Sequence, residues 1–267
     1  MDGITDEQIK KANKELHDIE ARYYDILHSE IWNFYEHSKT RRDLRKIAEI
    51  IEKETLDVLD VGAGTGNLTL KFLASGDTIT AIDICSEMLN VLSEKIPTNF
   101  NDNIELVCGD VDEFLLKTEQ KYDVISFSSV LHHLPDYIYT LNLASLQLVG
   151  GGVIYITHEP LPRLNEIGFF YHNVGRVLGL FDYYLNRLRL AKYSKLKLPD
   201  LDYSVSDIHS REGINPKELL EFLKSKGMKI EFYNEYECYK SGVVSILGNF
   251  LLDGRHLTLI ARKGESA

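Results

Sequence analysis

The sequence is short of cysteine and contains no long apolar run. Its 267 residues include 3 cysteines, Cys85, Cys108 and Cys238, in no CxxC or other metal-ligand spacing. An odd number of cysteines argues against a disulfide framework, and their spacing predicts no metal site. Residues 1–20 are charged throughout, unlike a signal peptide, and no stretch approaches the roughly 18 apolar residues of a membrane span. These absences predict a cytoplasmic protein without integral membrane contact.

Basic residues are also scarce relative to acidic ones. The chain has 41 Asp and Glu against 30 Lys and Arg, which gives a formal net charge of -11 at pH 7. A surface with this charge repels the phosphates of nucleic acids and anionic lipids, so a polyanionic partner would need a local basic patch. The composition therefore favours a small-molecule substrate and disfavours nucleic acid.

What the sequence does contain is a regular alternation of short apolar segments with helical ones. This alternation is typical of a parallel sheet that helices cover on both faces. Strands are expected at 56–61, 78–83, 103–110, 122–130, 152–159, 228–236 and 256–263. The pattern predicts a doubly wound, mostly parallel α/β sheet of seven strands. We divide the chain into an N-terminal helical cap, residues 1–37, and one domain, residues 38–267, which includes an insertion at 160–213.

A glycine-rich turn, DVGAGTG, follows the first expected strand at residues 60–66. In such a sheet, ligands bind beyond the carboxyl ends of the strands, and glycines let the backbone approach them closely. The dinucleotide fingerprint GxGxxG requires a third glycine at position 67, where this chain has Asn67. Asp60 would repel a phosphate but suits an ammonium group. The turn therefore disfavours a dehydrogenase, and a glycine-rich connection without a ligand is the alternative.

The next two expected strands end in carboxylates. Asp83 follows Gly62 by about 20 positions, where an acid can accept hydrogen bonds from both hydroxyls of a ribose. Asp110 can accept from an adenine amine, with Ile84 and Val111 on either side of the flat ring. It could also cap the following helix, alone or in addition. A ligand with an amine, a ribose and an adenine in a line, and no phosphate, has the shape of S-adenosylmethionine.

The chain resembles the class I S-adenosylmethionine-dependent methyltransferases in five successive motifs: DVGAGTG, AIDICSEML, VCGDVDEF, YDVISFSSVLHHLPD and LVGGGVIYITHEP. The resemblance implies a Rossmann-like methyltransferase fold for residues 38–267, with S-adenosyl-L-methionine as cofactor. It also implies which further residues contact the cofactor. Those near its methionine part are Gly62, Ala63, Gly64 and Ser128, and those that pack against it are Met88 and a tyrosine of the N-terminal helices, Tyr23 or Tyr24.

Two histidines are candidates for a general base, because histidine titrates near neutral pH. His133, in the pair His132-His133, follows the fourth expected strand, and His158 ends the fifth beside Glu159. Either one could instead shape the wall of the cofactor site or make structural hydrogen bonds. Methyl transfer depends mainly on aligning the nucleophile, the methyl group and sulfur. The reaction therefore does not require a conspicuous catalytic set.

The insertion at 160–213 interrupts the alternation and, in the resembling family, such an insertion forms a helical lid that supplies substrate specificity. Its aromatic residues could line a pocket for an apolar or aromatic substrate, or form a homodimer surface. Its basic stretch, residues 187–197, could contact an anionic group or be a solvated helix face. We expect methyl transfer to O, N or C of a small molecule. The alternatives are methylation of RNA or protein, and a non-catalytic S-adenosylmethionine-binding regulator.

Overall fold

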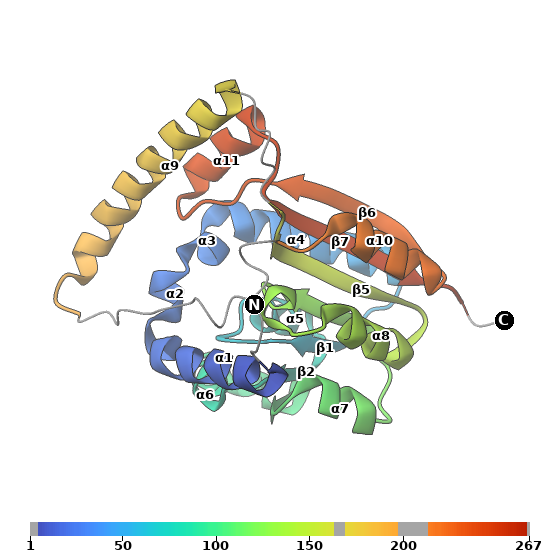
Figure 1. The fold of residues 1–267 in the computed structure, drawn as a ribbon. Coiled ribbons are helices and arrows are strands. Elements are labelled where there is room, and N and C mark those ends of the chain that lie inside the picture. Colours follow the sequence, from blue (N-terminus) through green and yellow to red (C-terminus); the bar gives the residue numbers. More distant parts are fainter. Residues whose placement is uncertain (1–4, 163–168, 197–212, 266–267) are drawn as a thin grey trace.

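In the computed structural model, which describes residues 5–162, 169–196 and 213–265, seven strands form one sheet in the order β3-β2-β1-β4-β5-β7-β6 (Figure 1). β7 runs antiparallel to β5 and β6, and the other neighbouring strands are parallel. The strands are β1 (Asp57–Val61), β2 (Thr78–Asp83), β3 (Ile104–Cys108), β4 (Tyr122–Ser128), β5 (Leu148–Pro160), β6 (Met228–Tyr236) and β7 (His256–Lys263). These strands confirm the predicted doubly wound, mostly parallel sheet. β5 begins earlier than expected, because Leu148 pairs with Tyr122 across an irregularity in register.

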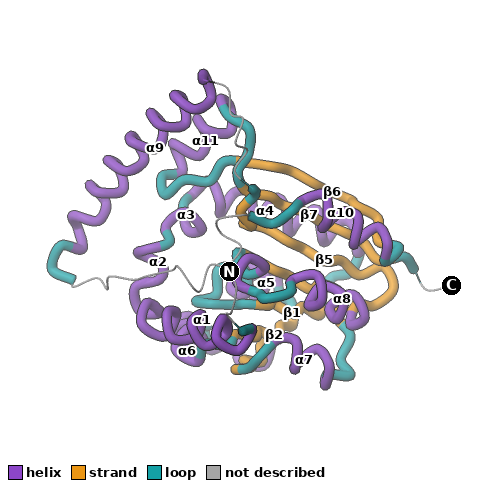
Figure 2. Tube along the Cα trace, viewed as in Figure 1, coloured by secondary structure: helices purple, strands orange, loops and turns teal. Residues whose placement is uncertain are grey.

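Helices cover both faces of the sheet (Figure 2). On one face α4, α5 and α6 pack against strand side chains that include Val58 and Val124, and on the other α7, α8 and α10 pack against side chains that include Leu59 and Ile125. Successive residues of a strand point to opposite faces, so strands covered on both sides are apolar almost throughout. The helices are α4 (Phe34–Ile51), α5 (Thr69–Ser75), α6 (Ser86–Lys95), α7 (Val111–Lys117), α8 (Tyr137–Gln147) and α10 (Pro216–Ser225).

Helical segments precede α4. They are α1 (Asp6–Glu20), the 3-10 turn η1 (Ala21–Tyr23), α2 (Tyr24–Leu27) and α3 (Ser29–Trp32). A capping box begins α1, because Thr5 Oγ1 accepts a hydrogen bond from the Gln8 backbone N–H at 3.3 Å and Gln8 Oε1 accepts from the Thr5 N–H at 2.8 Å. α1 contacts α6 and the 3-10 turn η3 (Leu131–His133). It therefore lies over the carboxyl ends of the strands.

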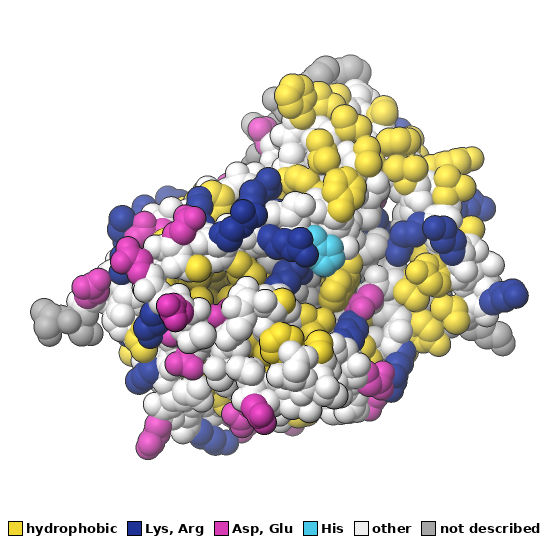
Figure 3. Space-filling model, turned by 180° about the vertical axis from the view of Figure 1, so that it is seen from behind, with side chains coloured by type: hydrophobic (Ala, Val, Ile, Leu, Met, Phe, Trp, Pro, Cys, Tyr) yellow, Lys and Arg dark blue, Asp and Glu magenta, His cyan; other side chains and the backbone are white. Residues whose placement is uncertain are grey.

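Two helices, α9 (Phe169–Leu190) and α11 (Gly242–Leu251), project from the sheet and form what we call the α9–α11 arm (Figure 1). Leu178 of α9 and Val244 of α11 pack together with Tyr239, which lies in the segment before α11. Many of their other apolar side chains gather on the surface (Figure 3), and Phe250 is 86% exposed. α9 lies within the predicted insertion, whose residues 163–168 and 197–212 are outside the described residues. α11 is not among the elements predicted from the sequence. Within the described ranges, no helix combines the length and apolarity needed to cross a membrane.

Candidate functional site

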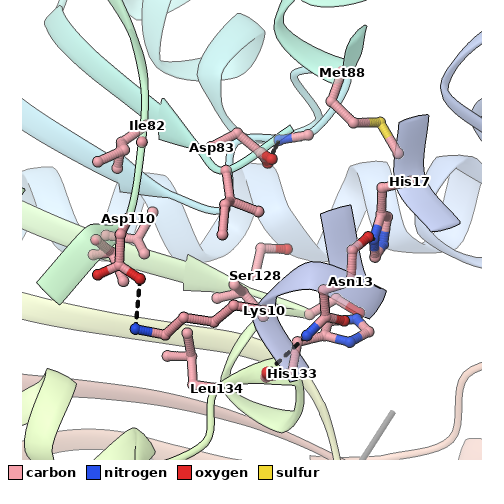
Figure 4. Close-up of a pocket in the computed structure, with 18 of the residues that line it drawn as sticks. Lys10, Asn13, His17, Ile82, Asp83, Met88, Asp110, Ser128, His133 and Leu134 are labelled. Atoms are coloured by element: carbon pink, nitrogen blue, oxygen red, sulfur yellow. Dashed lines mark hydrogen bonds and ion pairs between the residues drawn. The ribbon is translucent and has the colours of Figure 1, made fainter. Parts of the chain in front are cut away.

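A cavity opens at the carboxyl ends of β1 to β4, with α1 along one side (Figure 4). A smaller adjoining cavity is lined in part by Asp60 and Ala63. Of the predicted site residues, those that line the larger cavity are Gly62, Gly64, Asp83, Ile84, Met88, Asp110, Val111, Ser128 and His133. Tyr24 lines both cavities, whereas Tyr23 and His158 line neither of the two. The structure thus brings together most of the residues that the sequence places after four different strands.

The turn after β1 has a backbone geometry that favours glycine. Gly62 and Gly64 have φ angles of 65° and 53°, in the left-handed region. A Cβ atom on Gly62 would also lie 2.4 Å from Val130 Cγ2, so no side chain fits there. The N–H groups of Gly62 and Ala63 donate to the Ile82 carbonyl at 2.9 and 3.1 Å. The turn is therefore held tightly against the end of β2.

Asp83, at the end of β2, binds this turn from the other side. Its Oδ2 accepts from the Gly64 N–H at 2.8 Å, and its Oδ1 accepts from the Cys85 N–H at 2.8 Å. Burial raises the pKa of Asp83, and these two N–H groups oppose the shift. Each carboxylate oxygen has more than one acceptor site, so Asp83 can still accept hydrogen bonds from a ligand.

Asp110 caps a helix and also faces the cavity. Its Oδ1 accepts from the N–H groups of Asp112 and Glu113 at 2.9 and 3.1 Å, which confirms the cap at the start of α7. Its Oδ2 lies 2.6 Å from Lys10 Nζ (Figure 4). Burial alone would raise the pKa of Asp110, but the hydrogen bonds from Lys10 and the backbone outweigh it and lower this pKa. An ionised acceptor therefore stands at the cavity wall.

Three cavity residues of α1, Lys10, Asn13 and His17, are absent from the sequence prediction. They lie on one face of the helix at i, i+3 and i+7. Asn13 Nδ2 donates to the His133 carbonyl at 3.1 Å, and the His17 ring meets the His133 ring edge-on, with 5.3 Å between centroids. This spacing is visible in the sequence, but α1 is polar on several faces, so the pattern does not reveal which face meets a cavity.

Asp60 lies under the glycine turn and is buried. It accepts from Thr69 Oγ1 at 2.6 Å and from Ser126 Oγ at 2.8 Å. Burial raises the pKa of Asp60 to about 6, although both hydrogen bonds act in the opposite direction. Asp60 therefore both supports the turn and lines the smaller cavity.

The loop after β4 is held by Glu159, a residue for which the sequence alone predicts no role of its own. Glu159 is fully buried, and its Oε1 accepts from the N–H groups of Val130 and Leu131 at 2.7 and 2.9 Å. Its Oε2 accepts from the His132 N–H at 3.2 Å and lies 2.8 Å from His132 Nδ1. Glu159 thus fixes His132 behind the cavity and leaves His133 in the cavity wall.

His158 points away from Glu159, toward α4. Its side chain is buried, and its Nε2 lies 2.9 Å from Glu36 Oε2 and 3.8 Å from Cys238 Sγ. The two histidines that the sequence proposes as bases therefore occupy different surroundings. His133 lines the larger cavity, and His158 is part of a buried polar cluster.

Comparison with known proteins shows that residues 58–149 match the family described as methyltransferase domain. Malonyl-[acyl-carrier protein] O-methyltransferase of Acetivibrio thermocellus is 32% identical over 145 residues, which are 53% of this chain and 49% of the relative. Demethylmenaquinone methyltransferase of Staphylococcus aureus is 30% identical over 161 residues, which are 58% of this chain and 64% of the relative. The chain thus spans from about half to somewhat under two thirds of the length of these relatives.

Solved structures share the fold at lower sequence identity. The DhpI-SAM-HEP complex is similar with a TM-score of 0.57 and 18% identity, over 97% of this chain and 100% of that one. The N-methyltransferase NodS of Bradyrhizobium japonicum WM9, in complex with S-adenosyl-l-homocysteine, is similar with a TM-score of 0.55 and 13% identity, over 93% of this chain and 100% of that one. These likenesses confirm the Rossmann-like fold.

Proposed function

We propose that the chain is a class I S-adenosylmethionine-dependent methyltransferase and transfers a methyl group from S-adenosyl-L-methionine to a small-molecule acceptor, which its match to the methyltransferase domain family and its similarity to two methyltransferases support. The main support for the proposal is a row of potential ligand-binding groups that line one cavity at the ends of three adjacent strands. The row consists of the glycine turn after β1, Asp83 after β2 and Asp110 after β3. It matches the order of an amino acid, a ribose and an adenine.

In this proposal Asp83 accepts from the ribose hydroxyls and Asp110 from the adenine amine, while Ile84 and Val111 flank the adenine ring. The amine then competes with Lys10 for Asp110, since Lys10 Nζ lies 2.6 Å from Asp110 Oδ2. The other contacts we propose are with Tyr24 in place of Tyr23, Asp60, Gly62, Ala63, Gly64, Met88 and Ser128. Support comes from the position of all of these on the two cavities.

The bound cofactor would supply a methyl group already activated by its sulfonium. The residues of this chain would then align the acceptor, exclude water and, where the acceptor carries a proton, remove it. We assign proton removal to His133, because this histidine lines the larger cavity and Asn13 holds its backbone carbonyl. His158 would have to act from the buried side of β5, so it is the weaker candidate for the base.

We propose that the acceptor is partly apolar or aromatic. Support comes from the exposed apolar side chains of the α9–α11 arm, among them Leu180, Tyr184 and Phe250. The same face would suit a homodimer. Cytoplasmic location also remains a proposal, supported by the three free cysteines.

The proposal is tested by incubating the protein with methyl-labelled S-adenosylmethionine and fractionated cell metabolites. We expect S-adenosylhomocysteine to form and label to enter one small-molecule fraction, and mass spectrometry would then identify the methylated atom. Label in an RNA or protein fraction would instead favour those acceptors, for which the exposed Arg187, Lys192 and Lys195 are the candidate contacts. Tight cofactor binding with no turnover in any fraction would contradict the enzyme and favour a regulator.

A further inference from the structure

A second group of reactive side chains lies away from the cofactor cavity, between α4 and the end of β5. Glu36 comes from the first turn of α4, His158 from β5, and Cys238 from the segment between β6 and α11. All three are buried, with at most 8% of each residue exposed. One ligand atom from each, the Glu36 carboxylate oxygen, His158 Nε2 and Cys238 Sγ, lies within 4.8 Å of the other two.

A β-bulge aims His158 into this group. Thr157 pairs with Thr258 of β7, but Glu159 pairs with the adjacent Leu257, so His158 is an extra residue in β5. Its φ angle of 64° is unusual for a residue with a side chain. Thr157 already faces α4, since its Oγ1 accepts from Lys39 Nζ at 2.9 Å. The bulge lets His158 face α4 as well, while Glu159 faces the cavity loop, and such strain is typical of functional positions.

The distances between the three atoms suit a single metal ion. Cys238 Sγ lies 3.8 Å from His158 Nε2, and a tetrahedral Zn²⁺ would hold a bound sulfur and nitrogen about 3.6 Å apart. His158 Nε2 lies 2.9 Å from Glu36 Oε2, where the same geometry needs about 3.3 Å. The Glu36 carboxylate would therefore have to move by roughly half an ångström relative to His158, and it lies within 4.8 Å of Cys238 Sγ.

The Glu36 carboxylate also has unused bonding capacity. Among the described residues, neither of its oxygens has a hydrogen-bond partner, although Oε2 is close enough to His158 for an ion pair. A buried carboxylate without full hydrogen bonding is costly, because burial removes its water. The nearby cation Lys39 is already engaged by Asp43 at 3.1 Å and by Thr157.

We infer that Glu36, His158 and Cys238 form a binding site for one divalent transition-metal ion of the Zn²⁺ type. Thiolate, imidazole and carboxylate are the three ligand types that Zn²⁺ takes in proteins. On binding, the thiol proton of Cys238 leaves to solvent, so that one thiolate and one carboxylate neutralise the ion. The fourth position would go to water or to His256, whose buried Nδ1 has no hydrogen-bond partner among the described residues and whose ring centroid lies 5.8 Å from that of His158.

Such an ion would connect three parts of the chain that are far apart in sequence. It would link the start of α4 and the end of β5 to the segment that leads into α11 of the arm. None of these three residues lines either of the two cavities, so the ion would lie outside the proposed cofactor site. The inference does not depend on methyl transfer, because the ion would be bound without cofactor or acceptor.

The test uses the full chain freed of metal with a chelator and titrated with Co²⁺, which reports a bound thiolate by its sulfur-to-metal charge-transfer absorption. We expect one equivalent of Co²⁺ with this absorption, its displacement by Zn²⁺, and a higher melting temperature in Zn²⁺. Cys238→Ser should lose the absorption. It should also weaken binding by more than the roughly 10–100-fold that loss of an outer-shell partner costs. Cys108→Ser is the matched control, because Cys108 is an exposed thiol at the end of β3, and it should behave as wild type.

Circular dichroism of the metal-free proteins tests whether each variant is folded. If Cys238→Ser does not fold, the Co²⁺ affinity of Glu36→Gln tests the site instead, since this variant keeps the size of the side chain and removes the charged ligand. Binding of Co²⁺ by wild type without the thiolate absorption would overturn the site. So would equal affinity in wild type and Glu36→Gln, and in that case the cluster is an ion pair beside a thiol.

Discussion

The half of the sheet formed by β1 to β4 and the half formed by β5 to β7 with the α9–α11 arm differ in how they assemble their polar groups. In the first half, Asp83 ends β2 and Asp110 follows β3 by two residues, so groups that are neighbours in the sheet come from successive strands of the sequence. In the second half, His158 and Cys238 meet Glu36 of α4 only through the tertiary fold. A motif reveals the first kind of site, and only coordinates reveal the second.

The largest effect we predict concerns Asp83. Its carboxylate binds two backbone N–H groups and, in our proposal, both ribose hydroxyls. Hydrogen bonds to charged groups contribute about 1.5–3 kcal/mol each, so Asp83→Ala should weaken cofactor binding by about 100-fold or more. Isothermal calorimetry with S-adenosylmethionine measures this, with Asp102→Ala on the exposed surface as control. Near-normal affinity of Asp83→Ala would refute the cofactor assignment in the first half.

Much of the first half follows from sequence because parallel strands place their carboxyl ends along one edge. Asp83 ends β2 as expected, and the glycines of the turn match a backbone that other residues would strain. The orientation of His158 could not be predicted, since strict alternation along β5 places it on the opposite face from Thr157 and the bulge reverses this. The position of Lys10 at the cavity could not be predicted either, because its salt bridge with Asp110 spans 100 positions and leaves no local pattern in the sequence.

Glu159 joins the two halves, and its loss should also have a large effect. It belongs to β5 but accepts from three backbone N–H groups of the loop after β4. Glu159→Gln removes the charge and turns an N–H₂ group toward these donors, so we expect a loss of about 2–3 kcal/mol in the free energy of unfolding. Urea denaturation measures the loss, with the exposed Glu119→Gln as control. Unchanged stability would mean that the halves are not coupled through this carboxylate.

A pair of glycine variants separates steric contact from backbone strain. Gly62 and Gly227 have similar φ angles of 65° and 71°, but an added Cβ meets Val130 only at Gly62 and meets nothing within 4 Å at Gly227. Both alanine variants should lose about 1–2 kcal/mol from left-handed strain. Gly62→Ala should lose a further ~1–3 kcal/mol from overpacking and should also weaken cofactor binding. Equal melting temperatures for the two variants would show that the glycine turn shifts enough to accommodate a side chain at position 62.

The smallest effect on the cofactor site should come from the α9–α11 arm. Phe250 is 86% exposed on α11, so Phe250→Ser should change the free energy of unfolding by no more than about 0.5 kcal/mol. Cofactor affinity should stay as in wild type, because Phe250 lines neither cavity. If the arm contacts an apolar acceptor, KM for that acceptor should rise. If it forms a dimer, light scattering should show dissociation.

Leu116→Ser is the matched control for Phe250→Ser, since Leu116 is 63% exposed on α7, on the cofactor half of the sheet. Removing an exposed apolar side chain there should change neither KM nor oligomeric state. Equal behaviour of both variants in both measurements would mean that the apolar face of the arm has no partner in this reaction. A change confined to Phe250→Ser would assign acceptor or partner recognition to the second half, and cofactor binding to the first.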